Sequence, residues 1–518
     1  MMSSFVNDDV KLSDIDDTNI VERIQWCLTN GIVMANKKDI IPLSTSLLPS
    51  SLASSQSVLH APFSYNPYRY PSASFEKAKK LSYIFNKVID RISRNTSWLL
   101  NTLKSTAIGD PFTGRLLDIC DTINKDDGIK QHVALGLLRS DYMLHINDND
   151  PRTFLQVEIN TIASSFGSLS TKISELHRAF EVNRNIPENI ALDELCDGIA
   201  SAHYEYIRQI KQLQLYNNIH NNLIILMIIQ PGEANFADQR LLHLQLVKKY
   251  NNSIKLKRVT LAEVYTYGSI NNNTGELYFN GIPVSLVYFR AGYTPDDYPT
   301  DKEWDARLLI ERSFAIKCPN IGYHLAGTKK VQEVISTREV LSKFVDSPDD
   351  LNALMECFAG LYNLDIINQT EDVIKEVENT KKKVLESPSS YVMKPQREGG
   401  GNNIYGNDIV DALATMSDQE IAAYIIMERI QPPSQNSILI RNGTIFEASC
   451  HCELGVYGIF LGDGSSESYE SNNGRDFEST SPIHVNRYGG YLLRVKPNTS
   501  NEGGVQAGYA VLSSLDLI

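Results

Sequence analysis

The chain has 518 residues, of which 42% are hydrophobic and 21% are charged, and its net charge is −13. A chain of this length exceeds what one hydrophobic core usually supports, so we expect two or three packed units. The negative charge argues against nucleic acid or an anionic membrane as the main partner.

No segment of the sequence predicts export or membrane insertion. The N-terminus carries acidic residues where a secretory signal needs a basic flank and an apolar stretch. The longest apolar run, 223–229, is far shorter than the ~20 residues that span a bilayer. The seven cysteines are an odd number scattered along the chain, which fits a reducing compartment. We therefore expect a cytoplasmic protein.

The N-terminal third is predicted to begin with helices and to contain a strand with two polar side chains. Between 75 and 92, apolar residues recur at three- and four-residue steps, which predicts an amphipathic helix. From 154 to 160 the pattern alternates, so Glu158 and Asn160 share one face of a strand. A carboxylate and an amide oxygen suit a hard cation such as magnesium. The alternative is the exposed face of an edge strand.

The middle of the chain is predicted to form a separate α/β unit near 221–328. Residues 223–229 and 284–289 are continuous apolar runs, as expected for parallel strands covered on both faces. A helix is expected at 238–250, and the asparagine-rich segment 271–275 predicts a turn.

The last third is predicted to contain helices followed by a hairpin. Helices are expected at 329–344, 349–362 and 371–386. Asn442-Gly443 then separates two strand-like segments, which is a strong hairpin signal.

Further along the chain, 456–461 forms another apolar run, and 463–480 is expected to be a surface loop. Cys450 and Cys452 flank His451 on a predicted strand, so both thiols share a face. We interpret them as core residues, with a zinc site as the alternative.

Residues 394–405 predict a flap that binds nucleotide phosphates. Three consecutive glycines let backbone N–H groups approach an anion closely. Lys394, Arg397 and Glu398 supply charges for phosphate and for an accompanying metal. The established nucleotide signatures do not fit, because 322–329 lacks the Lys-Ser/Thr ending of a P-loop and no Gly-x-Gly-x-x-Gly follows a strand.

Paired cations precede a second glycine-rich loop. Arg494 and Lys496 alternate on one predicted face, and Gly503 to Gly508 follow shortly after. A mobile glycine loop after two cations suits closure over an anionic intermediate. Arg139, Arg290 and Lys329 are further candidates near strand ends or glycine-containing turns.

Taken together, these segments resemble eukaryotic glutathione synthetase, an ATP-grasp ligase family, from about Val21 to Val511. Besides the glycine flap, the similar segments are Leu138-Arg139-Ser140-Asp141-Tyr142, Glu158-Ile159-Asn160-Thr161-Ile162, Asn235-Phe236-Ala237-Asp238-Gln239-Arg240, Tyr288-Phe289-Arg290-Ala291-Gly292-Tyr293, Leu325-Ala326-Gly327-Thr328-Lys329-Lys330, Glu453-Leu454-Gly455 and Leu493-Arg494-Val495-Lys496.

The resemblance implies an α/β protein of the α+β ATP-grasp class, with an inserted Rossmann-like parallel α/β domain that binds substrate and a lid of helices and glycine loops. The implied parts are 1–220, 221–328 and 329–518. The implied reaction is ATP-dependent joining of γ-glutamylcysteine to glycine through an acyl phosphate, with ATP and magnesium, in a homodimer. No nucleic acid or membrane is an implied partner.

The resemblance also implies roles for individual residues. Magnesium would be held by Glu158, Asn160 and Glu398, and the catalytic residues would be Arg139, Arg494 and Lys496. The nucleotide would be surrounded by Glu158, Lys329, Lys394, Pro395, Gln396, Arg397, Glu398, Gly399, Gly400, Gly401, Asn402, Asn403, Tyr405, Met427, Glu428, Arg429, Ile430, Glu453, Lys496 and Glu502. The peptide substrates would contact Arg139, Ile162, Ala163, Ser164, Ser165, Glu233, Ala234, Asn235, Gln239, Arg290, Ala291, Gly292, Tyr293, Arg494, Val505 and Gln506.

Two positions depart from the family pattern. Ala163 stands where the family usually has serine, which removes one hydroxyl, and Gln506 stands where the acceptor loop commonly has alanine. Three hypotheses follow: a glutathione synthetase, a ligase of the same fold with another acceptor amine, and a ligand-binding homologue without turnover. The complete set of cations and metal ligands argues against the third.

Overall fold

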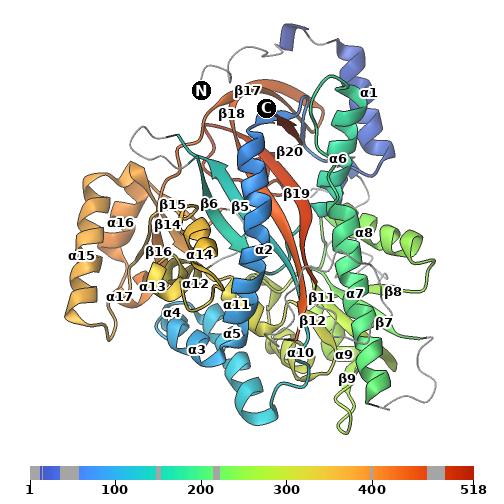
Figure 1. Ribbon diagram of the computed structural model, residues 1–518, viewed down its shortest axis with the longest axis vertical. Coiled ribbons are helices and arrows are strands. Elements are labelled where there is room, and N and C mark those ends of the chain that lie inside the picture. Colours follow the sequence, from blue (N-terminus) through green and yellow to red (C-terminus); the bar gives the residue numbers. More distant parts are fainter. Residues whose placement is uncertain are drawn as a thin grey trace.

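The computed structural model describes residues 12–14, 16–35, 58–146, 153–213, 222–396, 401–463 and 485–518. A large mixed sheet runs through the molecule, with helices against both faces and a smaller sheet at one side (Figure 1). The prediction of an α/β protein is confirmed. Among the described helices, none combines the length and the apolar character needed to cross a membrane.

The large sheet joins a mainly antiparallel part to a parallel part. The antiparallel part and the sheet's far end contain β3 (Phe63–Ser64), β5 (Ala134–Leu144), β6 (Phe154–Asn160), β9 (Gly268–Ile270), β10 (Leu277–Phe279), β17 (Gln435–Arg441), β18 (Thr444–Gly462), β19 (Val485–Pro497) and β20 (Val511–Ser513). The parallel part contains β7 (Ile224–Ile228), β8 (Lys255–Val259), β11 (Ile282–Phe289) and β12 (Ile316–Cys318). The order is β17-β3-β20-β19-β18-β5-β12-β11-β10-β9, with β6 beside β5 and β7 between β11 and β8.

The apolar runs predicted to be parallel strands are β7 and β11, which pair in parallel. β8 and β12 extend this parallel set on its two sides. Lys317 of β12 pairs with Ala134 of β5, so the parallel strands continue the large sheet. The helix predicted between the two runs is α8 (Phe236–Lys249), and α9 (Leu261–Tyr267) and α10 (Asp301–Arg312) follow along the chain.

Helices cover both faces of the central strands, which explains why most of the buried side chains on these strands are apolar. α2 (Ser72–Arg94), the predicted amphipathic helix, packs on one face, while α6 (Gly167–Phe180) and α7 (Ala191–Gln212) pack on the other (Figure 1). On β19, Leu493 faces the core under α2 and its neighbour Leu492 faces the core under α7. Complete burial of a leucine side chain stabilises the fold by roughly 1.5–3 kcal/mol.

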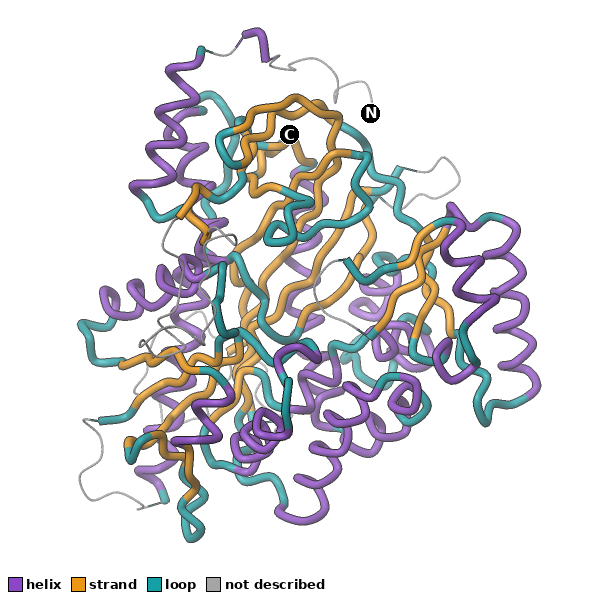
Figure 2. The backbone as a smooth tube through the Cα atoms, turned by 180° about the vertical axis from the view of Figure 1, so that it is seen from behind, coloured by secondary structure: helices purple, strands orange, loops and turns teal. Residues whose placement is uncertain are grey.

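The smaller sheet has its own core. Its strands are β13 (Leu361–Asn363), β14 (Tyr391–Pro395), β15 (Ile404–Tyr405) and β16 (Tyr424–Glu428). α15 (Glu371–Glu386), α16 (Asn407–Thr415) and α17 (Asp418–Ile421) accompany these strands, and Val384, Met393 and Ile409 pack together between helices and sheet. Figure 2 shows this unit beside the large sheet from behind.

The remaining elements surround these two sheets. The N-terminal and C-terminal segments contribute α1 (Asp17–Thr29), β1 (Val33–Ala35) paired with β2 (Val58–His60), and β4 (Tyr68–Tyr70) paired with β21 (Leu515–Leu517). The other helices are α3 (Thr96–Leu103), α4 (Thr106–Gly109), α5 (Pro111–Thr122), α11 (Ile321–Ala326), α12 (Lys329–Ile335), α13 (Arg338–Leu341) and α14 (Pro348–Met355), with short turns at η1 (Leu12–Asp14), η4 (Ile123–Asp127), η5 (Pro295–Asp297) and η6 (Pro388–Ser390).

Two predicted helices are shorter than expected. The prediction of a helix at 349–362 is wrong beyond Met355, where the helix ends. The carbonyl of Gly360 accepts a hydrogen bond from Glu428 N, and 361–363 forms a strand. Sheet pairing satisfies this backbone in place of a helix. The helix expected at 329–344 breaks after Ile335, where the hydroxyl of Ser336 bonds back to a carbonyl and Thr337 is extended.

The predicted hairpin is confirmed. Asn442 and Gly443 have φ angles of 51° and 74°, the left-handed pair that a tight two-residue turn requires. Cys450 and Cys452 are buried free thiols, as the core interpretation expects, and the described residues contain no cluster of histidine, cysteine and acidic side chains able to hold a metal. The surface loop expected at 463–480 lies outside the described residues apart from its first residue.

A buried histidine links α6 to β3 and to the residue that follows β20. His177 Nε2 lies 2.9 Å from the carbonyl oxygen of Ser64, and Nδ1 lies 2.7 Å from Oγ of Ser514. A carbonyl only accepts, so Nε2 carries the proton and Nδ1 accepts from the hydroxyl. Burial lowers the pKa of His177 from 6.5 to about 3 and so favours the neutral ring.

We predict that His177 makes stability depend on pH. The folded pKa is below the unfolded value, so its contribution is complete above about pH 6.5 and is lost as the pH falls toward 3, by at most ~1.4 kcal/mol per pH unit. Urea unfolding between pH 7 and 4 should show a shallower decline for His177→Gln than for the wild type. The exposed His132→Gln is the control and should keep the wild-type slope. Equal slopes for all three proteins would contradict the prediction.

Candidate active site

A cavity of about 890 Å³ lies where the large sheet meets the smaller sheet and the second glycine-rich loop. Its volume is in the range of small-molecule sites. Most of the predicted site residues line it: Arg139, Glu158, Asn160, Ile162, Ala163, Ser165, Tyr293, Lys329, Lys394, Asn402, Asn403, Tyr405, Met427, Glu428, Arg429, Ile430, Glu453, Arg494, Lys496, Glu502, Val505 and Gln506.

Other predicted residues are not part of this lining. Arg397, Glu398, Gly399 and Gly400 lie outside the described residues. Gln396 links two elements instead, because its side chain accepts from Lys330 N and donates to the carbonyl of Ala423. The remaining residues outside the lining are Ser164, Glu233, Ala234, Asn235, Gln239, Arg290, Ala291, Gly292, Pro395 and Gly401.

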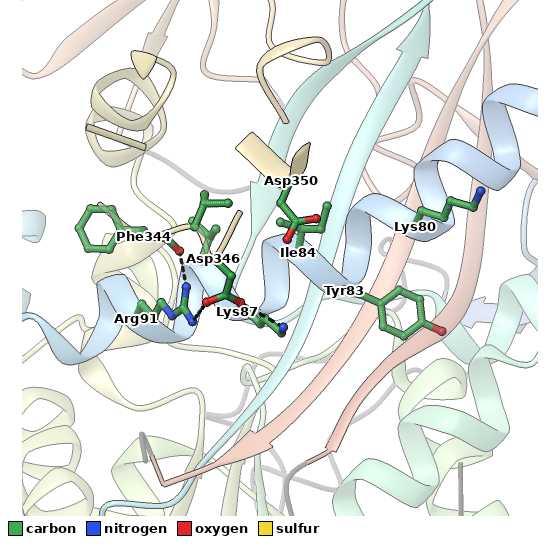
Figure 3. Close-up of a pocket in the computed structure, with 10 residues that line it drawn as sticks. Lys80, Tyr83, Ile84, Lys87, Arg91, Phe344, Asp346 and Asp350 are labelled. Carbon is green, nitrogen blue, oxygen red and sulfur yellow. Dashed lines mark hydrogen bonds and ion pairs between the residues drawn. The ribbon is translucent and has the colours of Figure 1, made fainter. Parts of the chain in front are cut away.

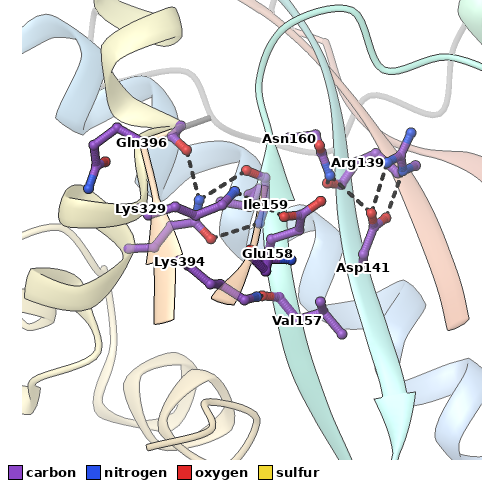
Figure 4. A network of polar contacts seen from close by, with 12 residues as sticks. Arg139, Asp141, Val157, Glu158, Ile159, Asn160, Lys329, Lys394 and Gln396 are labelled. Atoms are coloured by element: carbon purple, nitrogen blue, oxygen red, sulfur yellow. Dashed lines mark hydrogen bonds and ion pairs between the residues drawn. The ribbon is translucent and has the colours of Figure 1, made fainter. Parts of the chain in front are cut away.

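One wall of the cavity carries a carboxylate with two lysines beside it (Figure 4). Glu158 Oε2 lies 2.9 Å from Lys329 Nζ, and Lys394 Nζ donates to the carbonyl of Val157 at 3.0 Å. Burial acts to raise the pKa of Glu158, but the charges of Lys329 and Lys394 outweigh it and hold the pKa well below its usual range. Glu158 is therefore a carboxylate at neutral pH.

Strand alternation places these side chains. On β6, Glu158 and Asn160 both reach the cavity, as predicted. On β14, Val392 and Lys394 face the cavity while Met393 packs in the core of the smaller sheet. Lys329 is the first residue of α12, so its position depends on where that helix begins.

Oxygen ligands for magnesium are present in part. Asn160 Nδ2 donates to Asp141 Oδ2 at 3.0 Å and to the carbonyl of Arg139 at 3.3 Å. The amide oxygen accepts no hydrogen bond within the described part of the chain, which leaves it for another partner. Together with the Glu158 carboxylate it fits a hard cation. The third expected ligand, Glu398, lies outside the described residues.

A second wall carries two arginines and two carboxylates. Arg139 forms two hydrogen bonds with Asp141, and Arg494 contacts both Asp141 and Glu453. Burial raises the pKa of Glu453, with repulsion from Asp141 adding to it and attraction to Arg494 opposing it. The cluster balances charge inside the protein and leaves two guanidinium groups on the cavity wall.

Four of the predicted substrate residues outside the lining make buried polar contacts. Glu233 accepts from Asn235 N and from Gln239 Nε2, and Gln239 in turn accepts from Arg258 Nε. Arg290 pairs with Asp238 at 2.8 Å. Within the described residues, Nε of Arg290 and Oδ1 of Asn235 are buried without a hydrogen-bond partner. Buried unpaired polar atoms are costly, so these two atoms call for a partner that the described residues do not supply.

The first glycine-rich segment contacts the residues just before the second glycine-rich loop. Glu502 accepts from Gly401 N at 2.8 Å and from Asn403 Nδ2 at 3.3 Å. Asn501 accepts from Lys496 through its carbonyl and from Arg429 through its side chain. The flap and the second loop therefore share one polar contact region.

A family model described as eukaryotic glutathione synthase, ATP binding domain, matches residues 16–517. The chain belongs to the eukaryotic glutathione synthetase family. This membership makes it an ATP-dependent ligase.

Relatives from several kingdoms match over nearly the whole chain. Glutathione synthetase of Dictyostelium discoideum is 37% identical and covers 97% of this chain and 98% of its own. The human enzyme is 37% identical with coverages of 91% and 92%, and the chloroplastic enzyme of Solanum lycopersicum is 36% identical with coverages of 97% and 85%. The solved structure of a glutathione synthetase-like effector from Globodera pallida has the same fold, with a TM-score of 0.70, 19% identity and coverages of 97% and 96%.

Three residues of the glutathione synthetase site were missed by sequence reasoning. Asp141 binds the two arginines, Asn501 joins the loops, and Asp297 accepts from the backbone N–H groups of Gly292, Tyr293 and Thr294. The sequence did contain a signal for Asp141, because a residue two positions from Arg139 on a strand projects from the same face and could pair with it. The partners of the other two are decided by loop conformation.

A smaller cavity of about 300 Å³ lies on the outer side of α2 (Figure 3). Three of its charged residues bind one another: Lys87 and Arg91 both pair with Asp346, and Arg91 also donates to the carbonyl of Phe344. None of the predicted site residues lines this cavity.

We predict that Lys394→Met weakens nucleotide binding. Loss of a buried cation that faces the cavity removes a charge-assisted hydrogen bond, which corresponds to about 10- to 100-fold in Kd. Calorimetric titration with a non-hydrolysable ATP analogue and magnesium measures the change. Lys383→Met, on the exposed side of α15, is the control and should bind like the wild type. An unchanged Kd for a folded Lys394→Met protein would contradict the prediction.

Proposed function

We propose that this chain is a glutathione synthetase that joins γ-glutamylcysteine to glycine, with ATP converted to ADP and phosphate through an acyl phosphate. One observation carries the proposal: a carboxylate paired with Lys329, the cations Lys394 and Lys496, and two arginines line one cavity between the sheets. A carboxylate that attacks a phosphate brings two anions together, and fixed cations offset their repulsion.

The proposed nucleotide site lies between the smaller sheet and β6. Val392, Met427 and Ile430 offer apolar contacts suited to a purine, while Lys329 and Lys394 reach toward the phosphates. The glycine flap would cover the phosphates with backbone N–H groups. Glu158, Asn160 and Glu398 would hold magnesium, which neutralises phosphate charge when it is bound.

The proposed substrate site lies on the arginine side of the cavity. Arg139 and Arg494 would orient the peptide carboxylate and stabilise negative charge on the transferring phosphoryl oxygens. Arg290 and Asn235, which carry buried atoms without a hydrogen-bond partner among the described residues, would hold the far end of the dipeptide. Val505 and Gln506 would contact the acceptor amine.

Exclusion of water is the second requirement of this chemistry. An acyl phosphate has to meet the amine before water reaches it. The contacts of Glu502 with Gly401 and Asn403 support closure of both loops as one unit. No nucleophilic side chain is needed, because the amine attacks directly.

We also propose the finer architecture that the family implies. The parts are an ATP-grasp domain from 1–220 and 329–518 and an inserted Rossmann-like domain at 221–328, supported by the parallel pairing of β8, β7, β11 and β12. A homodimer and a cytoplasmic location complete the proposal. The cysteines, all free and buried, fit a reducing compartment.

Turnover with purified protein tests the proposed reaction. We predict ADP release that requires γ-glutamylcysteine, glycine and magnesium together, with glutathione as the product seen by mass spectrometry. Glu158→Gln should lower kcat by at least about 100-fold, because it removes the charge opposite Lys329 and a proposed metal ligand. A folded wild-type protein that binds ATP without turnover would instead support the non-catalytic alternative.

A second candidate function is ligation to a different acceptor amine. It is favoured by Gln506, a long amide on the cavity wall, and by Ala163, which also lines the cavity with a left-handed φ of 51°. The side chain of Gln506 can narrow the acceptor pocket or donate a hydrogen bond to a larger amine.

An acceptor panel decides between the two candidates. We predict that glycine has the highest kcat/KM among glycine, β-alanine, serine, glutamate and no amine. We also predict that Gln506→Ala changes the ratio of kcat/KM for glycine to kcat/KM for each other amine by less than about tenfold. A clear preference for another amine that disappears in Gln506→Ala would assign the second function.

A further inference from the structure

Asp141 lies at the centre of the arginine cluster without reaching the cavity. Its side chain is fully buried, with 0% exposure. It accepts from Arg139 Nε at 2.7 Å and Nη2 at 2.8 Å, from Arg494 Nη2 at 2.9 Å and from Asn160 Nδ2 at 3.0 Å. We propose that Asp141 is a positioning residue that sets the direction of both arginines and of the Asn160 amide, an inference that rests on the proposed ligase function.

The first argument concerns charge. Arg139 and Arg494 approach the same carboxylate, so their guanidinium groups would repel each other in a partly desolvated wall without it. Burial and the charge of Arg139 both act to lower the pKa of Arg494. The negative charges of Glu453 and Asp141 outweigh them, so the pKa of Arg494 is raised. Asp141 thus holds together two cations that the substrate phosphate and carboxylate would both need.

The second argument concerns the orientation of an amide. Asn160 has one donor end and one acceptor end, and Asp141 accepts from the donor end. The amide oxygen then remains for a cation beside Glu158. A carboxylate at 141 favours this orientation because it only accepts, as the carbonyl of Arg139 does, and an amide at 141 would weaken this preference.

The third argument comes from the neighbouring strand. Asp141 stands between Glu158 on β6 and Gly455 on β18 in the sheet register. A Cβ atom at Gly455 would come within 2.7 Å of both Asp141 Oδ1 and Arg139 Cδ. The glycine therefore leaves room for the Arg139–Asp141 pair to lie across β18, and a methyl group there would displace the pair without changing its charge.

Asp141→Asn tests the proposal because it keeps shape and removes the charge. We expect kcat to fall about 100-fold, measured at a temperature where the variant is folded, because loss of the buried charge also lowers the melting temperature. In a separate binding measurement, Mn²⁺ affinity in the presence of a non-hydrolysable ATP analogue, read by electron paramagnetic resonance, should weaken about tenfold through Asn160. Asp90→Asn is the matched control, since Asp90 is also fully buried and bonded to an arginine, Arg94, away from the cavity. It should keep the wild-type kcat and Mn²⁺ affinity.

Wild-type kcat and Mn²⁺ affinity in Asp141→Asn would overturn the proposal, as would a loss matched by an equal loss in Asp90→Asn. If Asp141→Asn does not fold, Gly455→Ala decides: a folded protein with lowered kcat and weakened Mn²⁺ binding supports the positioning role, and a protein that does not fold or behaves like the wild type overturns it. Absence of turnover in the wild type would defeat the proposed reaction alone, because the Mn²⁺ comparison still tests Asp141.

Discussion

The active-site cavity depends on pairing buried carboxylates with buried cations. Lys329 faces Glu158, Arg139 faces Asp141, and Arg494 contacts Asp141 and Glu453 at the meeting point of four strands. Removing any of these charges from water is costly unless an opposite charge compensates it. The pairs therefore allow a large sheet with two apolar faces to carry ionised groups at one place.

The position of the active-site cavity follows from the arrangement of the two sheets and the helices. Helices cover both faces of the central strands, and the charged side chains of these strands that line the cavity, Arg139, Glu453, Arg494 and Lys496, lie where the smaller sheet and the loops adjoin them. The smaller sheet contributes Lys394 with its own core behind it. The family's reaction needs both a fixed wall of cations and covers that exclude water. The large sheet provides the first, and the flap and the second loop provide the second.

Much of the fold could be predicted from the sequence. The amphipathic helix of 75–92, the alternation of 154–160, the buried strands and the Asn442-Gly443 hairpin are local patterns, and the structure has each of them. The motif similarity identified the family, which the comparisons confirm. The helix expected at 349–362 failed because long-range pairing of 361–363 with β16 outweighed local helix propensity.

The sequence by itself determined the fold class, the family and the faces of the strands on which the candidate residues lie, because those follow from periodicity and from residue type. Only the tertiary structure decided which charges meet. Asp141, Asn160 and Arg494 lie on three different strands, and a sequence does not state the register that brings a carboxylate within hydrogen-bonding distance of two arginines and an amide. That register is set by the packing of both sheet faces, and it turns separate polar residues into one cavity.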